Sequence, residues 1–239
     1  MRWETIEPDL RKRLWLAPGS TSLANELVSA LHLAPGQKAL DISPGTGVLA
    51  SMAAREHRVD VTCIANEPKT EAAIETVAAA LGVSDRVTVA HGTPSDTKLN
   101  PDEFDRIYSL GQPWIPLADH GVISEIYRVL KPDGFVGLAG PAAIINSTPD
   151  YMESVVKNVD GARLKTPAYT ALMFAQEGFH IVNAEFYPHS YDHWIAWLRE
   201  APAELVTDDF RRAVIQDSGR WLALGLIVLR KPPRPSWAV

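Results

Sequence analysis

The stretch from Lys38 to Ala50 reads K-A-L-D-I-S-P-G-T-G-V-L-A, and it decides how the rest of the chain is interpreted. A short apolar run carries one carboxylate, Asp41, near its end, and a turn with Gly45 and Gly47 follows. Apolar residues then resume at helical spacing from Val48. Glycine is favoured in such a turn because a residue without Cβ lets the backbone approach a ligand closely and adopt a positive φ. The pattern predicts a strand, a glycine turn and a helix whose free N–H groups and positive dipole end face a ligand crevice.

The composition is that of one globular α/β domain. The chain has 239 residues, of which 46% are hydrophobic and 22% are charged, and this length is sufficient for a single packed core. A net charge of −6 argues against a nonspecific nucleic-acid surface. No apolar run approaches the roughly 18 residues of a membrane span, and the start of the chain is too charged for a signal peptide. These observations predict a cytoplasmic protein with neither nucleic acid nor membrane as a partner.

Predicted strands and helices alternate from Gly36 onward. After the opening unit, β-rich runs are separated by segments with helical periodicity, and Pro68 and Gly82 stand where one of these helices would begin and end. The next four strands are expected at 59–65, 86–90, 104–109 and 135–139. Such alternation predicts an α/β fold with a doubly wound, mostly parallel sheet and helices on both faces.

A glycine turn of this kind serves two classes of cofactor site. A dinucleotide site reads G-x-G-x-x-G, whereas Ala50 stands at the third glycine position here. The turn more closely resembles motif I of the Rossmann-like class I S-adenosylmethionine-dependent methyltransferases, which is roughly D-x-G-x-G-x-G. Asp41, Gly45 and Gly47 match that motif, and Ser43 replaces its first glycine. Taken alone, the motif also fits an ordinary tight turn between a strand and a helix.

Other stretches extend this resemblance over most of the chain. The sequence Y-R-V-L-K-P-D-G-F at 127–135 is similar to the family's approach to its fifth strand, and F-D-R-I-Y-S at 104–109 is similar to its fourth. Residues 179–187 resemble the sixth strand, and residues 221–230 resemble the seventh, antiparallel strand. The resemblance therefore implies a Rossmann-like, seven-stranded sheet that is mostly parallel.

The predicted domain organisation follows from the same resemblance. Residues 1–35 would form an N-terminal helical segment that closes over the site, and residues 36–230 would form the methyltransferase-like domain. Connections at 141–167 and 189–220 are longer than usual, and they are interpreted as insertions that form the acceptor pocket. A proline-rich tail at 231–239 is expected to be loosely ordered.

The resemblance implies S-adenosylmethionine as the cofactor, bound at the carboxyl ends of the first four strands. The family's acid after the second strand falls on Ala65, so Glu67, Asn66 or a water molecule would hold the ribose, and Glu67 is favoured. Thr93 stands where the family has an acid after the third strand. The implied cofactor-binding residues are Asp41, Ser43, Gly45, Thr46, Gly47, Asn66, Glu67, Gly92, Thr93, Ser109 and Leu110.

Methyl transfer needs a general base only where the acceptor must lose a proton, because the sulfonium is already an activated electrophile. His189 is the first choice for that base, since it follows the sixth strand at the start of an insertion. Trp15, Tyr187 and Trp194 are expected to contact a small-molecule acceptor. Residues 110–114 replace the family's Asp/Asn-Pro-Pro-aromatic motif, which disfavours methylation of planar nucleic-acid or glutamine nitrogens.

No metal site is expected, because the chain has one cysteine and no H-E-x-x-H motif around His189 and His193. Substitutions at Ser43, Ala65 and Thr93 leave a second function open. A methyltransferase-like protein with an altered cofactor site could bind a partner without catalysis or catalyse a reaction other than methylation. A nicotinamide oxidoreductase is a further alternative, disfavoured by the predicted seventh strand and by the absent third glycine.

Overall fold

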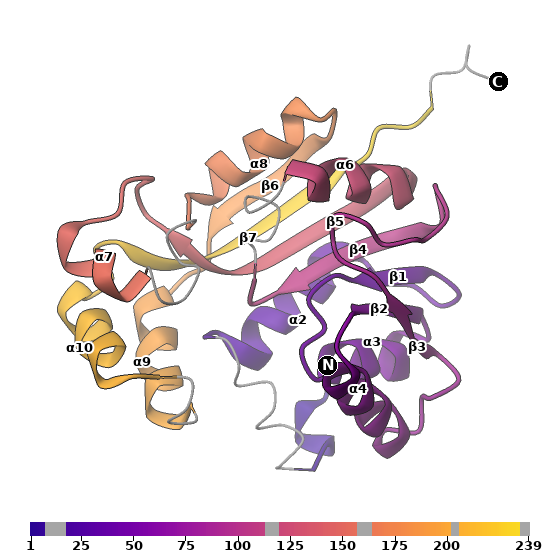
Figure 1. Cartoon of the computed structure of the whole chain (residues 1–239), viewed down its shortest axis with the longest axis horizontal. Coiled ribbons are helices and arrows are strands. Elements are labelled where there is room, and N and C mark those ends of the chain that lie inside the picture. The colour runs from indigo at the N-terminus through magenta and orange to yellow at the C-terminus, as the bar shows by residue number, and fades with distance from the viewer. Residues whose placement is uncertain (8–17, 113–119, 157–163, 202–205, 235–239) are drawn as a thin grey trace.

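The structure is a computed structural model of the chain, and it describes residues 1–7, 18–112, 120–156, 164–201 and 206–234. Its centre is a seven-stranded sheet with the strand order β3-β2-β1-β4-β5-β7-β6 (Figure 1). The strands are β1 (Lys38–Asp41), β2 (Asp60–Ala65), β3 (Val87–His91), β4 (Phe104–Leu110), β5 (Leu130–Ala143), β6 (His180–Phe186) and β7 (Leu222–Arg230).

The strand directions confirm the predicted fold class. β1 pairs in parallel with β2 and β4, β2 pairs in parallel with β3, and β4 pairs in parallel with β5. β7 runs antiparallel to both β5 and β6. The strand order reverses beside β1, so the loops after β1 and β4 diverge there, at the edge where open α/β sheets bind their ligands.

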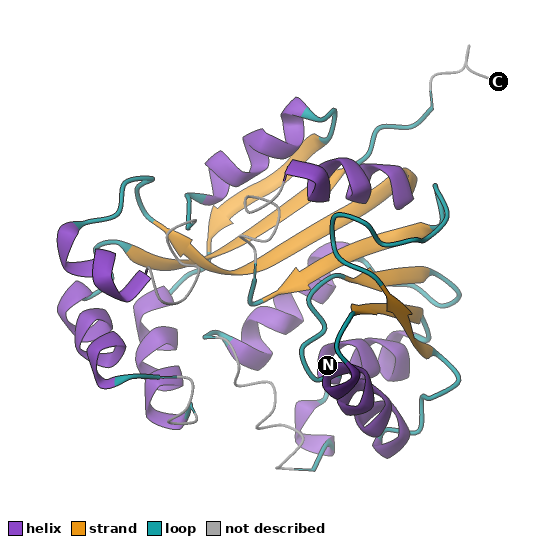
Figure 2. Cartoon of the chain, viewed as in Figure 1, coloured by secondary structure: helices purple, strands orange, loops and turns teal. Residues whose placement is uncertain are grey.

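Helices cover both faces of the sheet (Figure 2). On one face lie α2 (Ser20–Leu31), α3 (Val48–His57) and α4 (Pro68–Ala80), whose apolar side chains belong to the larger of two buried clusters. The other face is covered by α6 (His120–Val129) and α8 (Pro167–Gln176). Successive strand residues point to opposite faces, so Ala39 lies in the first cluster and Leu40 in the second. The sheet is therefore apolar on both sides, as a parallel sheet between helices requires.

Three further helices gather beyond the ends of β5, β6 and β7 (Figure 1): α7 (Asp150–Val156), α9 (Ser190–Glu200) and α10 (Asp208–Asp217). The buried carboxylate of Asp217 joins this group to the sheet. It accepts hydrogen bonds from the backbone N–H groups of Trp221 and Leu222, each at 3.0 Å, and from the Tyr151 hydroxyl at 2.7 Å. One side chain thus connects α7, α10 and the start of β7.

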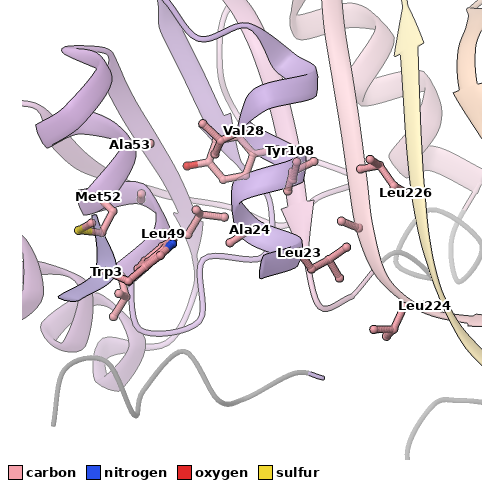
Figure 3. Packing of buried hydrophobic residues seen from close by; sticks show 14 of the residues in the cluster. Trp3, Leu23, Ala24, Val28, Leu49, Met52, Ala53, Tyr108, Leu224 and Leu226 are labelled. Atoms are coloured by element: carbon pink, nitrogen blue, oxygen red, sulfur yellow. The ribbon is translucent and has the colours of Figure 1, made fainter. Parts of the chain in front are cut away.

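The start of the chain packs on the same face as α2 and α3. In η1 (Trp3–Thr5) the indole of Trp3 lies beside Leu49 and Met52 (Figure 3), and its N–H donates to Asn25 Oδ1 at 2.8 Å. α2 packs against β4, β5 and β7, so it is part of the layer that covers the sheet. The expected closure of the N-terminal segment over the site depends on residues 8–17, which lie outside the described residues.

Two segments differ from the expected boundaries. β5 begins earlier than predicted, because an irregularity between Phe104 and Arg106 lets Leu130 pair with Phe104. The C-terminal tail begins with Lys231, whose buried ammonium group donates to the Asp102 carboxylate at 2.8 Å and to the Leu130 carbonyl at 2.7 Å. These bonds fix Lys231 to the sheet, and the loose order expected for the rest of the tail stays a prediction.

Candidate functional site

The loops after β1, β2, β3 and β4 meet at one edge of the sheet, because parallel neighbours end on the same side. The register places Asp41 beside both Cys63 and Tyr108, and Ala65 beside His91. Every residue implied as cofactor-binding lies in one of these loops or at the end of one of these strands. The structure therefore brings these residues to a common edge, whereas the role of each stays a prediction.

The glycine turn is built as the sequence predicts, but its two glycines have different surroundings. Gly45 is exposed with φ 53°, and Thr46 beside it is half-buried. Gly47 is buried with φ 78°, and a Cβ added there would lie 3.0 Å from the Cα of Ile74 in α4. Gly47 is thus required by the contact between the turn and α4. Whether either glycine also lets the backbone approach a ligand stays a prediction.

The N-terminus of α3 directly follows this turn. Gly47 is its N-cap residue, and no side chain in the described part of the chain caps the helix. The first N–H groups of a helix have no partner within the helix, and its dipole places partial positive charge there. An anionic group such as a carboxylate is well suited to this position.

Asp41 lies beneath the turn and is almost completely buried. Only 2% of its surface is exposed, and its Oδ1 accepts one hydrogen bond, from the backbone N–H of Ser43 at 3.0 Å. Burial raises the pKa of Asp41 from its ordinary value of 3.8 to about 7, while the Ser43 N–H and the nearby Tyr108 hydroxyl act in the opposite direction. A carboxyl group with this pKa changes its charge near neutral pH.

Ser43 occupies the place of the family's first glycine for a structural reason. Its Oγ lies 2.7 Å from the Oγ of Ser109, and the Ser109 hydroxyl also donates to the carbonyl of Gln112 at 3.3 Å. The Ser43 hydroxyl lies 3.5 Å from the carbonyl of Leu110 as well. These contacts tie the glycine turn to the end of β4 and to the loop after it.

The loop after β2 places two polar side chains at the same edge. Asn66 and Glu67 are both exposed, directly after the buried Ala65. Glu67 is the N-cap residue of α4, but its side chain makes no capping hydrogen bond; its carbonyl accepts the N–H groups of Thr70 and Glu71 instead. The Glu67 carboxylate is therefore available to accept hydrogen bonds from a ligand.

The loop after β3 is a tight turn. The backbones of Thr93 and Asp96 exchange two hydrogen bonds, at 3.1 and 3.0 Å, and a Cβ added at Gly92 would lie 2.9 Å from the Asp96 carbonyl oxygen. The Thr93 side chain is exposed. At the end of β3, the imidazole of His91 lies 3.6 Å from the carboxylate of Glu71.

The residues expected to serve the acceptor lie at the other end of the sheet. His189 follows β6 with φ 54°, and its side chain is 80% exposed and 3.8 Å from Asp192. Tyr187 is half-buried, and its ring lies against that of His193 at a centroid distance of 5.2 Å. β6 is four strand positions from β1, which is roughly 19 Å at the usual strand spacing. The structure does not bring His189 and the glycine turn together.

Trp194, which is predicted to contact the acceptor, is buried and packs within the core. Only 4% of it is exposed, its indole N–H donates to the Ala223 carbonyl at 3.2 Å, and its ring packs edge to face against Trp197. Phe210 completes this aromatic group. Trp194 is thus part of the core between α9, α10 and β7, and its contact with an acceptor stays a prediction. Trp15 lies outside the described residues.

A cavity of about 370 Å³ lies where β6 ends and β7 begins. Its walls are mostly apolar, and they include Ile144, Phe186, His189, Tyr191, Leu222 and Ala223. The hydroxyl of Ser190, which also borders it, is already used: it donates to the Tyr187 carbonyl at 2.5 Å and accepts from the Leu224 N–H at 3.0 Å. The cavity suits a group with an apolar surface.

Sequence reasoning did not single out Tyr108. Its side chain is fully buried on the α2 and α3 face (Figure 3), and its hydroxyl has no hydrogen-bond partner among the described residues. The signal was present in F-D-R-I-Y-S, where a phenol interrupts the apolar end of a strand that pairs with β1.

In the described part of the chain, no helix is long and apolar enough to cross a membrane. Nor do three or more His, Cys, Asp or Glu side chains gather there in a way that could hold a metal ion.

Comparison with known proteins agrees with this geometry. Residues 39–134 match the family model described as a methyltransferase domain. The chain is 21% identical over 218 residues to a glycine/sarcosine/dimethylglycine N-methyltransferase of Actinopolyspora halophila. That alignment covers 88% of this chain but 38% of the relative, so the chain spans well under half the length of the curated relative that it matches.

Solved structures share the fold. Geranyl diphosphate C-methyltransferase from Streptomyces coelicolor A3(2), in complex with Mg²⁺, geranyl diphosphate and S-adenosyl-L-homocysteine, is similar with a TM-score of 0.76 and 17% identity, over 89% of this chain and 77% of that one. The [4+2]-cyclase SpnF is similar with a TM-score of 0.70 and 20% identity, over 89% of this chain and 80% of that one. Residues 39–134 are thus similar to a methyltransferase domain, and the chain has the seven-stranded fold of the class I methyltransferases that the resemblance implies.

Proposed function

We propose that this protein is an S-adenosylmethionine-dependent methyltransferase that acts on a small-molecule acceptor. The observation that carries the proposal is the match of residues 39–134 to the methyltransferase domain. The N-terminus of α3, which directly follows the glycine turn, supports it. The curated relative and the geranyl diphosphate enzyme are both named as methyltransferases of small molecules, which supports this class of acceptor.

The residues at the carboxyl edge fit the chemical groups of S-adenosylmethionine. The N-terminus of α3 and the exposed Gly45 suit the methionine carboxylate, and Asp41 beneath them suits the positive charge of the amino group. The exposed Glu67 would accept hydrogen bonds from the ribose hydroxyls, because the methyl side chain of Ala65 cannot. Thr93 would face the adenine.

When bound, the cofactor supplies a methyl group on a sulfonium, which needs no further activation. The chain would contribute alignment and the exclusion of water. The Ser43–Ser109 contact would hold the glycine turn at a fixed distance from the end of β4. At roughly 19 Å from β1, His189 would accept a proton only from an acceptor that extends along the strand ends.

The acceptor side is proposed to be formed by the two insertions. The cavity at the ends of β6 and β7 supports this, because Ile144 comes from the first insertion and Tyr191 from the second. Charged side chains are few in its wall, so an acceptor with an apolar portion is favoured over glycine or sarcosine. We place the protein in the cytoplasm. Its net charge of −6 also disfavours a nucleic-acid partner.

The test is cofactor binding followed by a search for acceptors. Isothermal titration calorimetry with S-adenosylmethionine at fixed salt should give a saturable dissociation constant, and incubation with small molecules that carry an apolar portion should yield S-adenosylhomocysteine by mass spectrometry. If S-adenosylmethionine and S-adenosylhomocysteine both fail to bind, the proposed function is wrong.

A second candidate keeps the cofactor site but not the reaction. The [4+2]-cyclase has the same fold and is not named as a methyltransferase, and Ser43 and Ala65 depart from the family's pattern here. A protein that binds the cofactor yet never converts it with any acceptor would favour this candidate or a noncatalytic partner-binding role. A nicotinamide oxidoreductase remains disfavoured, since β7 is antiparallel.

A further inference from the structure

Three ionisable side chains lie in one row beneath the glycine turn. The sheet register places Asp41 of β1 between Cys63 of β2 and Tyr108 of β4. Their exposed fractions are 2% for Asp41 and 0% for the other two. The row is therefore sealed from solvent, directly under the loop that the proposed function assigns to the cofactor.

Two groups in this row, the Asp41 carboxyl and the Tyr108 hydroxyl, can each form a further hydrogen bond. The Asp41 carboxyl group receives one donor, the Ser43 N–H, and this bond is made to Oδ1. The Tyr108 hydroxyl is buried and has no hydrogen-bond partner among the described residues, although it is close enough to Asp41 to act on its pKa. The Tyr108 hydroxyl is therefore a buried donor beside a carboxyl group that can accept a further hydrogen bond.

No compensating cation faces Asp41 from the described elements around it. β2 contributes the Cys63 thiol and β4 the Tyr108 phenol, and these are the titratable groups that act on it. The turn after β1 contributes no charged side chain. The buried part of α3 is apolar apart from Ser51, and the buried residues of α4 are apolar. Burial without a cation favours the neutral acid, as the raised pKa of about 7 reflects.

We propose that Tyr108 is a positioning residue for Asp41, and that its hydroxyl donates to the Asp41 carboxylate when a cationic ligand group binds above the turn and Asp41 releases its proton to solvent. This inference rests on the proposed function. The ligand group is the ammonium of an amino acid moiety, and it keeps its own proton. A cation at the turn acts on Asp41 through a low-dielectric layer, so direct contact with the buried carboxylate is not required.

The proposal predicts that ligand affinity depends on pH. With Asp41 neutral below about pH 7 in the free protein, binding of an amino-acid-bearing ligand at lower pH must remove a proton. Linkage then makes binding roughly tenfold tighter at pH 8 than at pH 6. S-adenosylhomocysteine is the probe, since it carries the amino acid moiety and cannot react. 5′-Methylthioadenosine, which lacks that moiety, is the control ligand and should bind equally at both pH values.

The experiment is calorimetric titration at pH 6, 7 and 8, in buffers with different ionisation enthalpies, to count the protons released. Asp41→Asn should abolish the pH dependence with S-adenosylhomocysteine. Tyr108→Phe should move the midpoint of the pH dependence upward and weaken binding at pH 7 several-fold, with 5′-methylthioadenosine unaffected. Tyr169→Phe, a change of a half-exposed phenol on α8, should behave as the parent.

The outcomes separate the inference from the proposed function. Two results would overturn the inference and leave the proposed function intact. One is binding of S-adenosylhomocysteine at pH 6 without proton release, and the other is a Tyr108→Phe variant with the parent's pH profile. If neither probe binds the parent, both are wrong. Should Tyr108→Phe fail to fold, the link between ligand binding and loss of the Asp41 proton is tested without it. Absence of proton release at pH 6 in the parent, or its persistence in Asp41→Asn, would overturn the inference.

Discussion

The two ends of the sheet differ in what positions their side chains. At the β1 end, a short turn, one buried carboxylate and the N-terminus of α3 form the candidate cofactor site. At the β6 end, aromatic rings of the second insertion pack around Trp194, and Asp217 connects both insertions to the start of β7. The contrast separates a candidate site formed where neighbouring parallel strands end from a region whose side chains are held by packing between helices and β7.

The largest effect is expected from a side chain added at Gly47, the buried glycine at the β1 end. Gly47→Val combines an unfavourable positive φ with a contact to the Ile74 backbone, and it should lower the free energy of unfolding by about 4 kcal/mol. Gly36→Val is the control, since Gly36 has φ 82° but nothing near its Cβ position; it should cost about 2 kcal/mol. Urea denaturation of both variants checks this, and equal losses would show that the contact with α4 is unimportant.

The next effect concerns the β6 end. Asp217→Ala removes the acceptor of two backbone N–H groups and of the Tyr151 hydroxyl, so we expect a loss of about 3 kcal/mol in unfolding free energy. Asp208→Ala, an exposed change on the same helix, should cost far less. Affinity for S-adenosylhomocysteine should be unchanged in the folded protein. A large drop in that affinity would mean that the two ends are coupled.

A third prediction follows from the raised pKa of Asp41 in the ligand-free protein. Because its folded pKa of about 7 exceeds the ordinary value of 3.8, its contribution to stability is fully present below pH 3.8 and is lost as pH rises to about 7. Asp41→Asn removes this dependence. The stability difference between variant and parent should therefore shift by roughly 2.5 kcal/mol in favour of the variant from pH 5 to pH 8. Urea titrations at both pH values measure it, and a constant difference would contradict the raised pKa.

The smallest effect is expected from a change at Glu67, which tests whether its carboxylate binds the cofactor ribose. If Glu67 has taken over from the missing acid at Ala65, Glu67→Ala should weaken cofactor binding about tenfold at fixed salt. Glu75→Ala on the exposed side of α4 is the matched control. A silent Glu67→Ala, combined with tighter binding in Ala65→Asp, would assign the ribose to water instead.

Local sequence signals were sufficient for much of the fold. The strands β1 to β4 lie within a residue or two of their predicted positions, because apolar runs, Pro68 and the glycines act over a few residues along the chain. The glycine turn and its helix were predicted for the same reason. The seventh, antiparallel strand followed from resemblance, since periodicity alone does not give strand direction.

Tertiary structure decided what those residues touch. Gly47 faces Ile74 of the next helix, and Tyr108 lies beside Asp41 only because β4 pairs with β1, although 66 residues separate the two in the sequence. His189 follows a strand that the sheet order places at its far end, so its distance from the turn could not be read from the sequence. Which side chains meet depends on strand order and helix packing, and these are set by the burial of both sheet faces at once rather than by any local pattern.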